Sequence, residues 1–101
     1  MSEGQVIITG MENGTYIRTL EGWTRVNQET GYWVAKEEVD PSDVEVGQCL
    51  GVWTDSNDKT WYDRTYFVDD LNAALILARE WNQLAIWDNA NQTEIPMNPN
   101  Y

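Results

Sequence analysis

The feature that most constrains this fold is one helical repeat of apolar residues in the last third of the chain. The repeat consists of Leu71, Ala74, Leu75, Ala78 and Trp81. Spacings of three and four residues place these side chains on one face of an α-helix. Asp69 or Asp70 can cap its first turn, because a carboxylate there accepts orphan backbone N–H groups. We predict one amphipathic helix over about residues 70–82, with Val68 packed against its first turn and Asn82 as its exit.

The segments on either side of this helix have the composition of short strands. Residues 60–68 are rich in β-branched and aromatic side chains, and the turn-forming run 55–59 separates them from the apolar run 49–54. These two runs predict a hairpin. After the helix, residues 84–87 predict a buried strand, and residues 93–95 predict its partner, stopped by Pro96. Trp81 and Trp87 are predicted to belong to the core.

The N-terminal third predicts two hairpins or a meander over residues 5–36. Asn13-Gly14 separates the β-prone runs 6–9 and 16–20, and this dipeptide is a strong hairpin signal. Residues 27–31 form a polar turn between the runs 23–26 and 32–35. Residues 36–48 then change character, because Pro41 interrupts any ladder and can open a single helical turn behind Asp40. Val39, Val44 and Val46 are its apolar anchors.

Together these patterns predict an α+β fold: a mainly antiparallel sheet of hairpins with one amphipathic helix packed on it. A length of 101 residues suits one domain, which we expect over residues 1–96, followed by a tail over 97–101.

Charge excludes several kinds of partner. Seventeen acidic residues face six basic ones, giving a net charge of −11. Binding to nucleic acid requires basic side chains that neutralise phosphates, and anionic membrane surfaces impose the same demand. We therefore expect no direct binding to nucleic acid or to membranes. The charge favours a basic protein partner, although acidity can also serve solubility alone.

The residue types also restrict catalysis. The chain has no histidine and a single cysteine, Cys49, so it cannot build a histidine-dependent triad or the usual zinc site. No phosphate-binding glycine motif is present. Residues 55–60 begin like a calcium loop but lack the glycine that an EF-hand needs at its sixth position. We predict a protein that is not an enzyme, with no metal and no cofactor, and with Cys49 as a buried structural residue.

Neither a secretory signal nor an apolar run long enough to span a membrane is visible, which indicates a cytoplasmic protein. One cysteine requires no oxidising compartment.

The candidate binding residues are acidic and aromatic. Five acids fall within nine residues, namely Glu37, Glu38, Asp40, Asp43 and Glu45. Such a run is commonly a solvated loop, but carboxylates held on a rigid loop can also stand in for phosphates. Trp33 and Trp61 are the candidate aromatic contacts, since tryptophan is enriched at binding hot spots. The alternative is that these rings cover the far side of a twisted sheet.

The last half of the chain resembles a family of small proteins carried by phages and bacterial mobile elements. The resemblance rests on Gly51–Asp55, Thr60–Asp63, the helix from Val68 to Arg79, and above all the run Asn82–Asp88 (NQLAIWD) with Glu94-Ile95. No activity is established for that family, so the resemblance implies a setting in a bacterial host cell and assigns no site residue.

Three functions are compatible with these observations. The first is a non-enzymatic inhibitor that resembles DNA in charge and occupies the basic surface of a host nucleic-acid-binding or defence protein. The second is a phage structural or assembly protein, for which a homo-oligomer stays open. The third is a small glycan hydrolase that uses two carboxylates.

Overall fold

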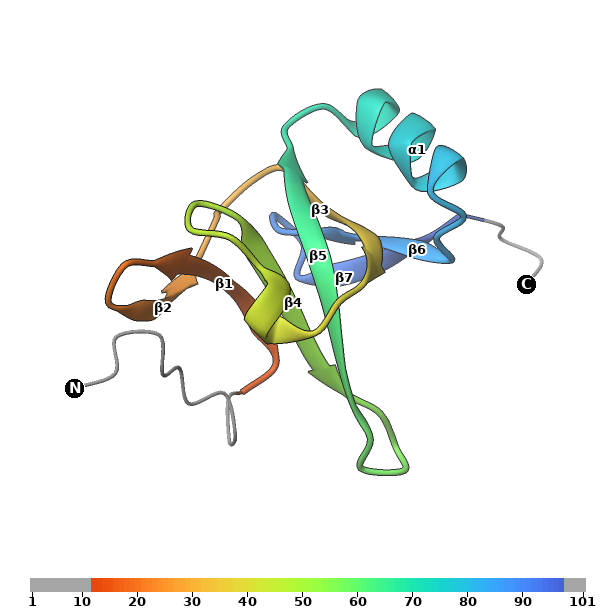
Figure 1. The fold of residues 1–101 in the computed structure, drawn as a ribbon. Coiled ribbons are helices and arrows are strands. Elements are labelled where there is room, and N and C mark those ends of the chain that lie inside the picture. Colours follow the sequence, from red (N-terminus) through yellow and green to blue (C-terminus); the bar gives the residue numbers. More distant parts are fainter. Residues whose placement is uncertain (1–11, 98–101) are drawn as a thin grey trace. The chain divides into compact units, whose positions relative to one another are not determined.

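The structure is a computed structural model that describes residues 12–97 and combines one antiparallel sheet with one helix (Figure 1). Its elements are β1 (Gly14–Thr19), β2 (Gly22–Val26), β3 (Tyr32–Glu38), a 3₁₀ turn η1 (Pro41–Asp43), β4 (Cys49–Thr54), β5 (Thr60–Val68), α1 (Leu71–Glu80), β6 (Ala85–Asp88) and β7 (Thr93–Pro96). The strands follow the order β2-β1-β4-β5-β3-β6-β7. The predicted α+β class, with a helix packed on a sheet of hairpins, is confirmed.

The chain divides into two compact units. Among the described residues, the first unit contains residues 12–27 and Glu38–Arg64, and the second contains Gln28–Glu37 and residues 65–97. The expectation of a single domain over residues 1–96 stays a prediction.

In the first unit, β1 pairs with β2 on one side and with β4 on the other. The predicted hairpin of 49–54 with 60–68 is present, since β4 and β5 are neighbours. The core of this unit consists of Tyr16, Val44, Leu50 and Val52, with Trp23, Val39 and Tyr62 packed against it. Alternation along β4 explains why Leu50 and Val52 face inward together.

The predicted pairing of residues 23–26 with 32–35 is wrong. β2 instead pairs with β1, with Thr19 opposite Gly22, across the two-residue connection at 20–21. The Thr19 hydroxyl supports this tight turn by donating to the Gly22 carbonyl at 3.1 Å. A two-residue loop is enough to close a hairpin, so β2 pairs with β1, the strand that directly precedes it in the chain. The other predicted strand, residues 6–9, lies outside the described residues.

In the second unit, α1 packs on the sheet through Ala74 and Ala78, which form a core with Val34 of β3 and Ile86 of β6. Asp70 caps the helix by accepting the Ala73 N–H at 2.9 Å, so Asp70 rather than Asp69 is the N-cap. Asn82 has a φ of 57° and ends the helix in the left-handed conformation, as predicted. None of the helices formed within residues 12–97 is long and apolar enough to cross a membrane.

Four residues predicted to be buried are exposed. Leu84 is 62% exposed and lies just before β6 rather than within it. Leu71 is 39% exposed, whereas Ala74 and Ala78 are the helix residues that form the core with Val34 and Ile86. Trp87 is 37% exposed, because Ile86 takes the side of β6 that faces the helix and the next side chain must point away. Val46 is 55% exposed, and only Val39 and Val44 anchor the acidic connection.

The turn after β6 explains a buried carboxylate. Asp88 is buried, but its oxygens accept the Ala90 N–H at 3.0 Å and the Asn91 side-chain amide at 2.8 Å. These bonds compensate the loss of water around the charge and fix the reversal into β7. Met97, just after β7, packs against the core of the second unit, and its backbone N–H donates to the Leu84 carbonyl at 2.9 Å.

Candidate binding surface

The acidic connection between β3 and β4 is held to the first unit by backbone hydrogen bonds. The Val39 N–H donates to the Tyr62 carbonyl of β5 at 3.0 Å. Farther along, two guanidinium groups donate to backbone carbonyls: Arg18 to Val44 at 3.2 Å and Arg64 to Asp43 at 3.3 Å. Val44 itself is buried in the core. The connection is therefore anchored at several points along its length.

Asp40 and Pro41 shape the centre of this connection as predicted. Asp40 caps η1, and Pro41 occupies the first position of the turn. One carboxylate oxygen of Asp40 accepts both the Ser42 N–H at 2.9 Å and the Ser42 hydroxyl at 2.8 Å. These hydrogen bonds lower the pKa of Asp40 below its ordinary value, since they favour the charged form. Asp40 thus contributes a negative charge and also holds the local backbone.

All five acids of the predicted segment are exposed, namely Glu37, Glu38, Asp40, Asp43 and Glu45. The last four belong to the first unit, whereas Glu37 belongs to the second. Glu37 and Glu38 are consecutive on β3, so their side chains leave opposite faces of the strand. Glu38, Asp40, Asp43 and Glu45 therefore lie along one anchored connection of the first unit, to which Glu37 does not belong.

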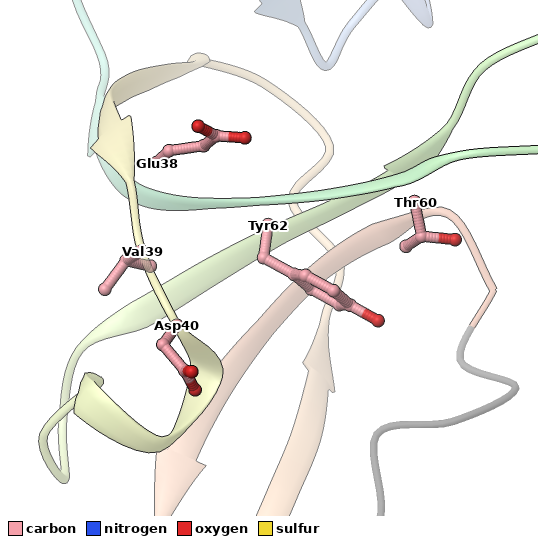
Figure 2. Close-up of a pocket in the computed structure, with 5 residues that line it drawn as sticks. All are labelled: Glu38, Val39, Asp40, Thr60 and Tyr62. Atoms are coloured by element: carbon pink, nitrogen blue, oxygen red, sulfur yellow. The ribbon is translucent and has the colours of Figure 1, made fainter.

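A hollow of about 300 Å³ lies where this connection meets β5 (Figure 2). Its lining consists of Glu38, Val39, Asp40, Thr60 and Tyr62. In Figure 2, Glu38 ends β3, Val39 and Asp40 follow it, and the last two residues belong to β5. Two carboxylates, one hydroxyl and one phenol suit a hydrogen-bond donor or a cationic group far better than an anion.

Asp63 is a member of this region that the sequence analysis did not select. Burial raises the pKa of its carboxyl, the negative charge of Glu38 raises it further, and a hydrogen bond from the Trp53 side chain opposes both. The charge of Glu38 thus acts on Asp63 although the two residues are 25 positions apart in sequence. The alternation of β5, which puts Asp63 and Trp61 on the same face, was the available signal.

Trp53 and Trp61 form a stacked pair across the β4–β5 hairpin. Their ring centroids are 6.2 Å apart, and the ring planes differ by 17°. The Trp61 indole N–H donates to the Asp55 carboxylate at 3.0 Å, and the Lys59 ammonium lies 4.0 Å from the Trp61 ring centroid. Trp61 is partly buried, whereas Trp53 is 48% exposed. We call Trp53, Trp61, Asp63 and Glu38 the aromatic–acidic patch.

Trp33, the other predicted aromatic contact, does not lie on a surface. It is 7% exposed and meets the Phe67 ring edge-on, with centroids 5.4 Å apart. The prediction that its ring is available to a partner is wrong, because Phe67 on β5 lies against it. The tryptophan of the first unit that is exposed is Trp53, which lies on β4.

The remaining candidate groups have structural roles. Cys49 is partly buried, and burial raises the pKa of its thiol, which disfavours the reactive thiolate. One Asp55 oxygen accepts the backbone N–H groups of Asn57 at 2.8 Å and Lys59 at 3.0 Å, so the calcium-like run is a hairpin turn. Within residues 12–97 no group of three or more acids or cysteines is placed to hold a metal ion.

Comparison of this chain with known protein families, with characterised proteins and with solved structures finds no match. The resemblance to phage and mobile-element proteins therefore stays a prediction.

Proposed function

We propose that this chain is a non-enzymatic binding protein whose acidic connection docks on the basic surface of a host protein, such as a nucleic-acid-binding or defence protein. The observation that supports the proposal is that Glu38, Asp40, Asp43 and Glu45 lie on a segment whose backbone is held to the first unit by hydrogen bonds. Carboxylates on an anchored backbone lose less conformational entropy on binding than carboxylates on a free loop. The net charge of −11 adds long-range attraction toward a basic partner.

The size of the effect can be bounded. An exposed ion pair contributes about 0.2–1 kcal/mol, and its contribution falls as salt screens the charges. Losing three such pairs should raise Kd roughly 3- to 150-fold. The expected partner therefore binds more weakly at high salt.

The test is a charge-reversal triple variant, Glu38→Lys, Asp43→Lys and Glu45→Lys. Asp40 is left intact because its carboxylate caps η1. Host proteins captured at low salt and released at high salt would be identified by mass, and the Kd of the purified partner would then be measured against each variant. We expect the triple variant to bind at least threefold more weakly, with a shallower salt dependence.

A matched control changes the net charge equally at positions that do not belong to the acidic connection. Glu29→Lys, Glu80→Lys and Glu94→Lys replace three exposed acids of the second unit. Equal weakening by both triple variants would mean that total charge matters and the acidic connection does not, which would refute the proposed docking surface.

A second candidate, a phage structural or assembly protein, is favoured by apolar side chains exposed on the second unit. They are Phe67, Leu71, Ile76, Leu84 and Trp87. Isolated exposed apolar residues are ordinary, but several within one small unit suit contact between copies. Sedimentation of the wild type and of Trp87→Lys tests this alternative. A monomer at all concentrations, absent from virions, would rule it out.

A third candidate, a glycan hydrolase, is favoured by the electrostatic interaction of Asp63 with Glu38 beside Trp53. A carboxyl of raised pKa near a second carboxylate is the arrangement that glycosidases use. A panel of polysaccharides incubated with the protein tests this function, and an absence of released reducing ends would rule it out on those substrates.

A further inference from the structure

We infer that the exposed face of Trp53 is the docking site for an arginine side chain of the basic protein partner, with Asp63 and Glu38 supplying the neighbouring negative charge. This inference rests on the proposed function and adds to it a specific aromatic ring, a specific kind of partner side chain, and two residues outside the run 37–45, Trp53 and Asp63.

The Trp53 ring is both accessible and held in place. It is 48% exposed, yet it stacks on Trp61 across the hairpin, and its indole donates to Asp63. The Trp61 ring is tied in turn to Asp55 by a hydrogen bond of 3.0 Å. A large aromatic surface that is already ordered loses little entropy on binding, which is why such rings dominate binding energy at interfaces.

The charge around this ring favours a cation. Asp63 accepts the Trp53 N–H at the edge of the ring, and the charge of Glu38 acts on Asp63. Repulsion between these two carboxylates is relieved when a positive group approaches either of them. The same two charges disfavour an anionic ligand, and they give no advantage to a neutral sugar.

The patch already holds one cation from its own chain. The Lys59 ammonium lies 4.0 Å from the Trp61 ring centroid, close enough for a cation–π interaction. Trp61 is thus occupied internally, whereas its stacking partner Trp53 remains exposed. Arginine suits the exposed ring better than lysine, because the planar guanidinium can stack on an indole while it donates to a carboxylate.

The test uses acetylated, amidated hexa-arginine as the probe and follows the tryptophan side-chain N–H signals by NMR. We expect the Trp53 signal to shift more than that of Trp87, another exposed tryptophan, which lies in the second unit. Trp53→Leu keeps an apolar side chain but removes the aromatic face. It should raise Kd roughly two- to fivefold, as expected for an exposed cation–π contact. Trp87→Leu is the matched control and should leave Kd unchanged.

The outcomes separate this inference from the proposed function. If hexa-arginine binds but Trp53→Leu and Trp87→Leu have the same affinity as wild type, the arginine site is refuted while acidic docking stands. If Trp53 shifts and Trp53→Leu weakens binding, but charge reversal at Asp43 and Glu45 alone does not weaken capture of the host partner, the acidic connection is refuted and the ring site stands.

Two further measurements keep the test decisive. A shift of Trp53 with neutral chitotetraose but not with hexa-arginine would overturn the inference in favour of a sugar platform. The Trp61 signal and the thermal midpoint of Trp53→Leu report whether the hairpin is intact. Should this variant unfold, Trp53→Phe replaces it, with a smaller expected increase in Kd and the same refuting result.

Discussion

Gly31→Ala provides a sharp test of the packing in the second unit. Gly31 lies before β3 with a φ of 82°, a left-handed conformation that L side chains adopt at a cost. A methyl group there would also collide with the Phe67 ring, because an ideal Cβ lies 2.4 Å from its Cζ and 2.5 Å from its Cε1. The substitution therefore combines backbone strain with a steric clash.

Each contribution has a known order of magnitude. The left-handed conformation costs about 1–2 kcal/mol for a residue with a Cβ. Overpacking adds about 1–3 kcal/mol, including loss of the edge-on contact between Phe67 and Trp33 when the ring moves. We expect Gly31→Ala to lower the free energy of unfolding by roughly 2–5 kcal/mol.

Gly47→Ala is the matched control, because Gly47 has a φ of 93° and an added Cβ would meet nothing within 4 Å. It should cost only the strain, about 1–2 kcal/mol. The cost of Gly31→Ala should fall to the same range in a Phe67→Ala background, where the ring is absent. Urea unfolding followed by circular dichroism measures the free energies of unfolding of the wild type, the three single variants and the Gly31→Ala/Phe67→Ala double variant. Equal costs for Gly31→Ala and Gly47→Ala, or an unchanged cost in the Phe67→Ala background, would refute the clash.

Three further predictions concern single side chains. Asp70→Ala removes the helix cap and should lower the free energy of unfolding by about 1 kcal/mol, and an unchanged thermal midpoint would contradict its role. Leu50→Ala opens the fully buried core of the first unit and should cost about 2–5 kcal/mol in urea unfolding, whereas Leu84→Ala, at an exposed position, should change it by less than about 0.5 kcal/mol. Asp63→Asn should stabilise the fold at neutral pH, because folding raises the pKa of Asp63 and its ionised form is therefore disfavoured in the native state. This gain should disappear as pH falls below the ordinary pKa of a carboxyl, where both side chains are neutral, and a gain that persisted there would contradict the assignment.

The aromatic residues show where sequence reasoning reached its limit for the candidate site. Trp33 and Trp53 both lie on short strands of apolar and aromatic residues, yet one is buried and the other is about half exposed. The difference arises from Phe67, which comes from a distant strand and lies against Trp33. Asp63 was overlooked for the same reason, because its interaction with Glu38 exists only after β3 and β5 come together.

Elements whose signals are local could be predicted from the order of residues alone. The helix with an aspartate cap at Asp69 or Asp70 and its exit at Asn82, the β4–β5 hairpin, and the turn at Asp40-Pro41 depend on residues close together in the chain. Tertiary structure alone decided that β2 pairs with β1, that Trp87 points away from the helix, and that Trp53 lies beside Asp63. The pairing of a strand and the exposure of its side chains depend on which segment, remote in sequence, packs against it. Alternation of side chains within a strand defines its two faces but does not identify the face that becomes buried.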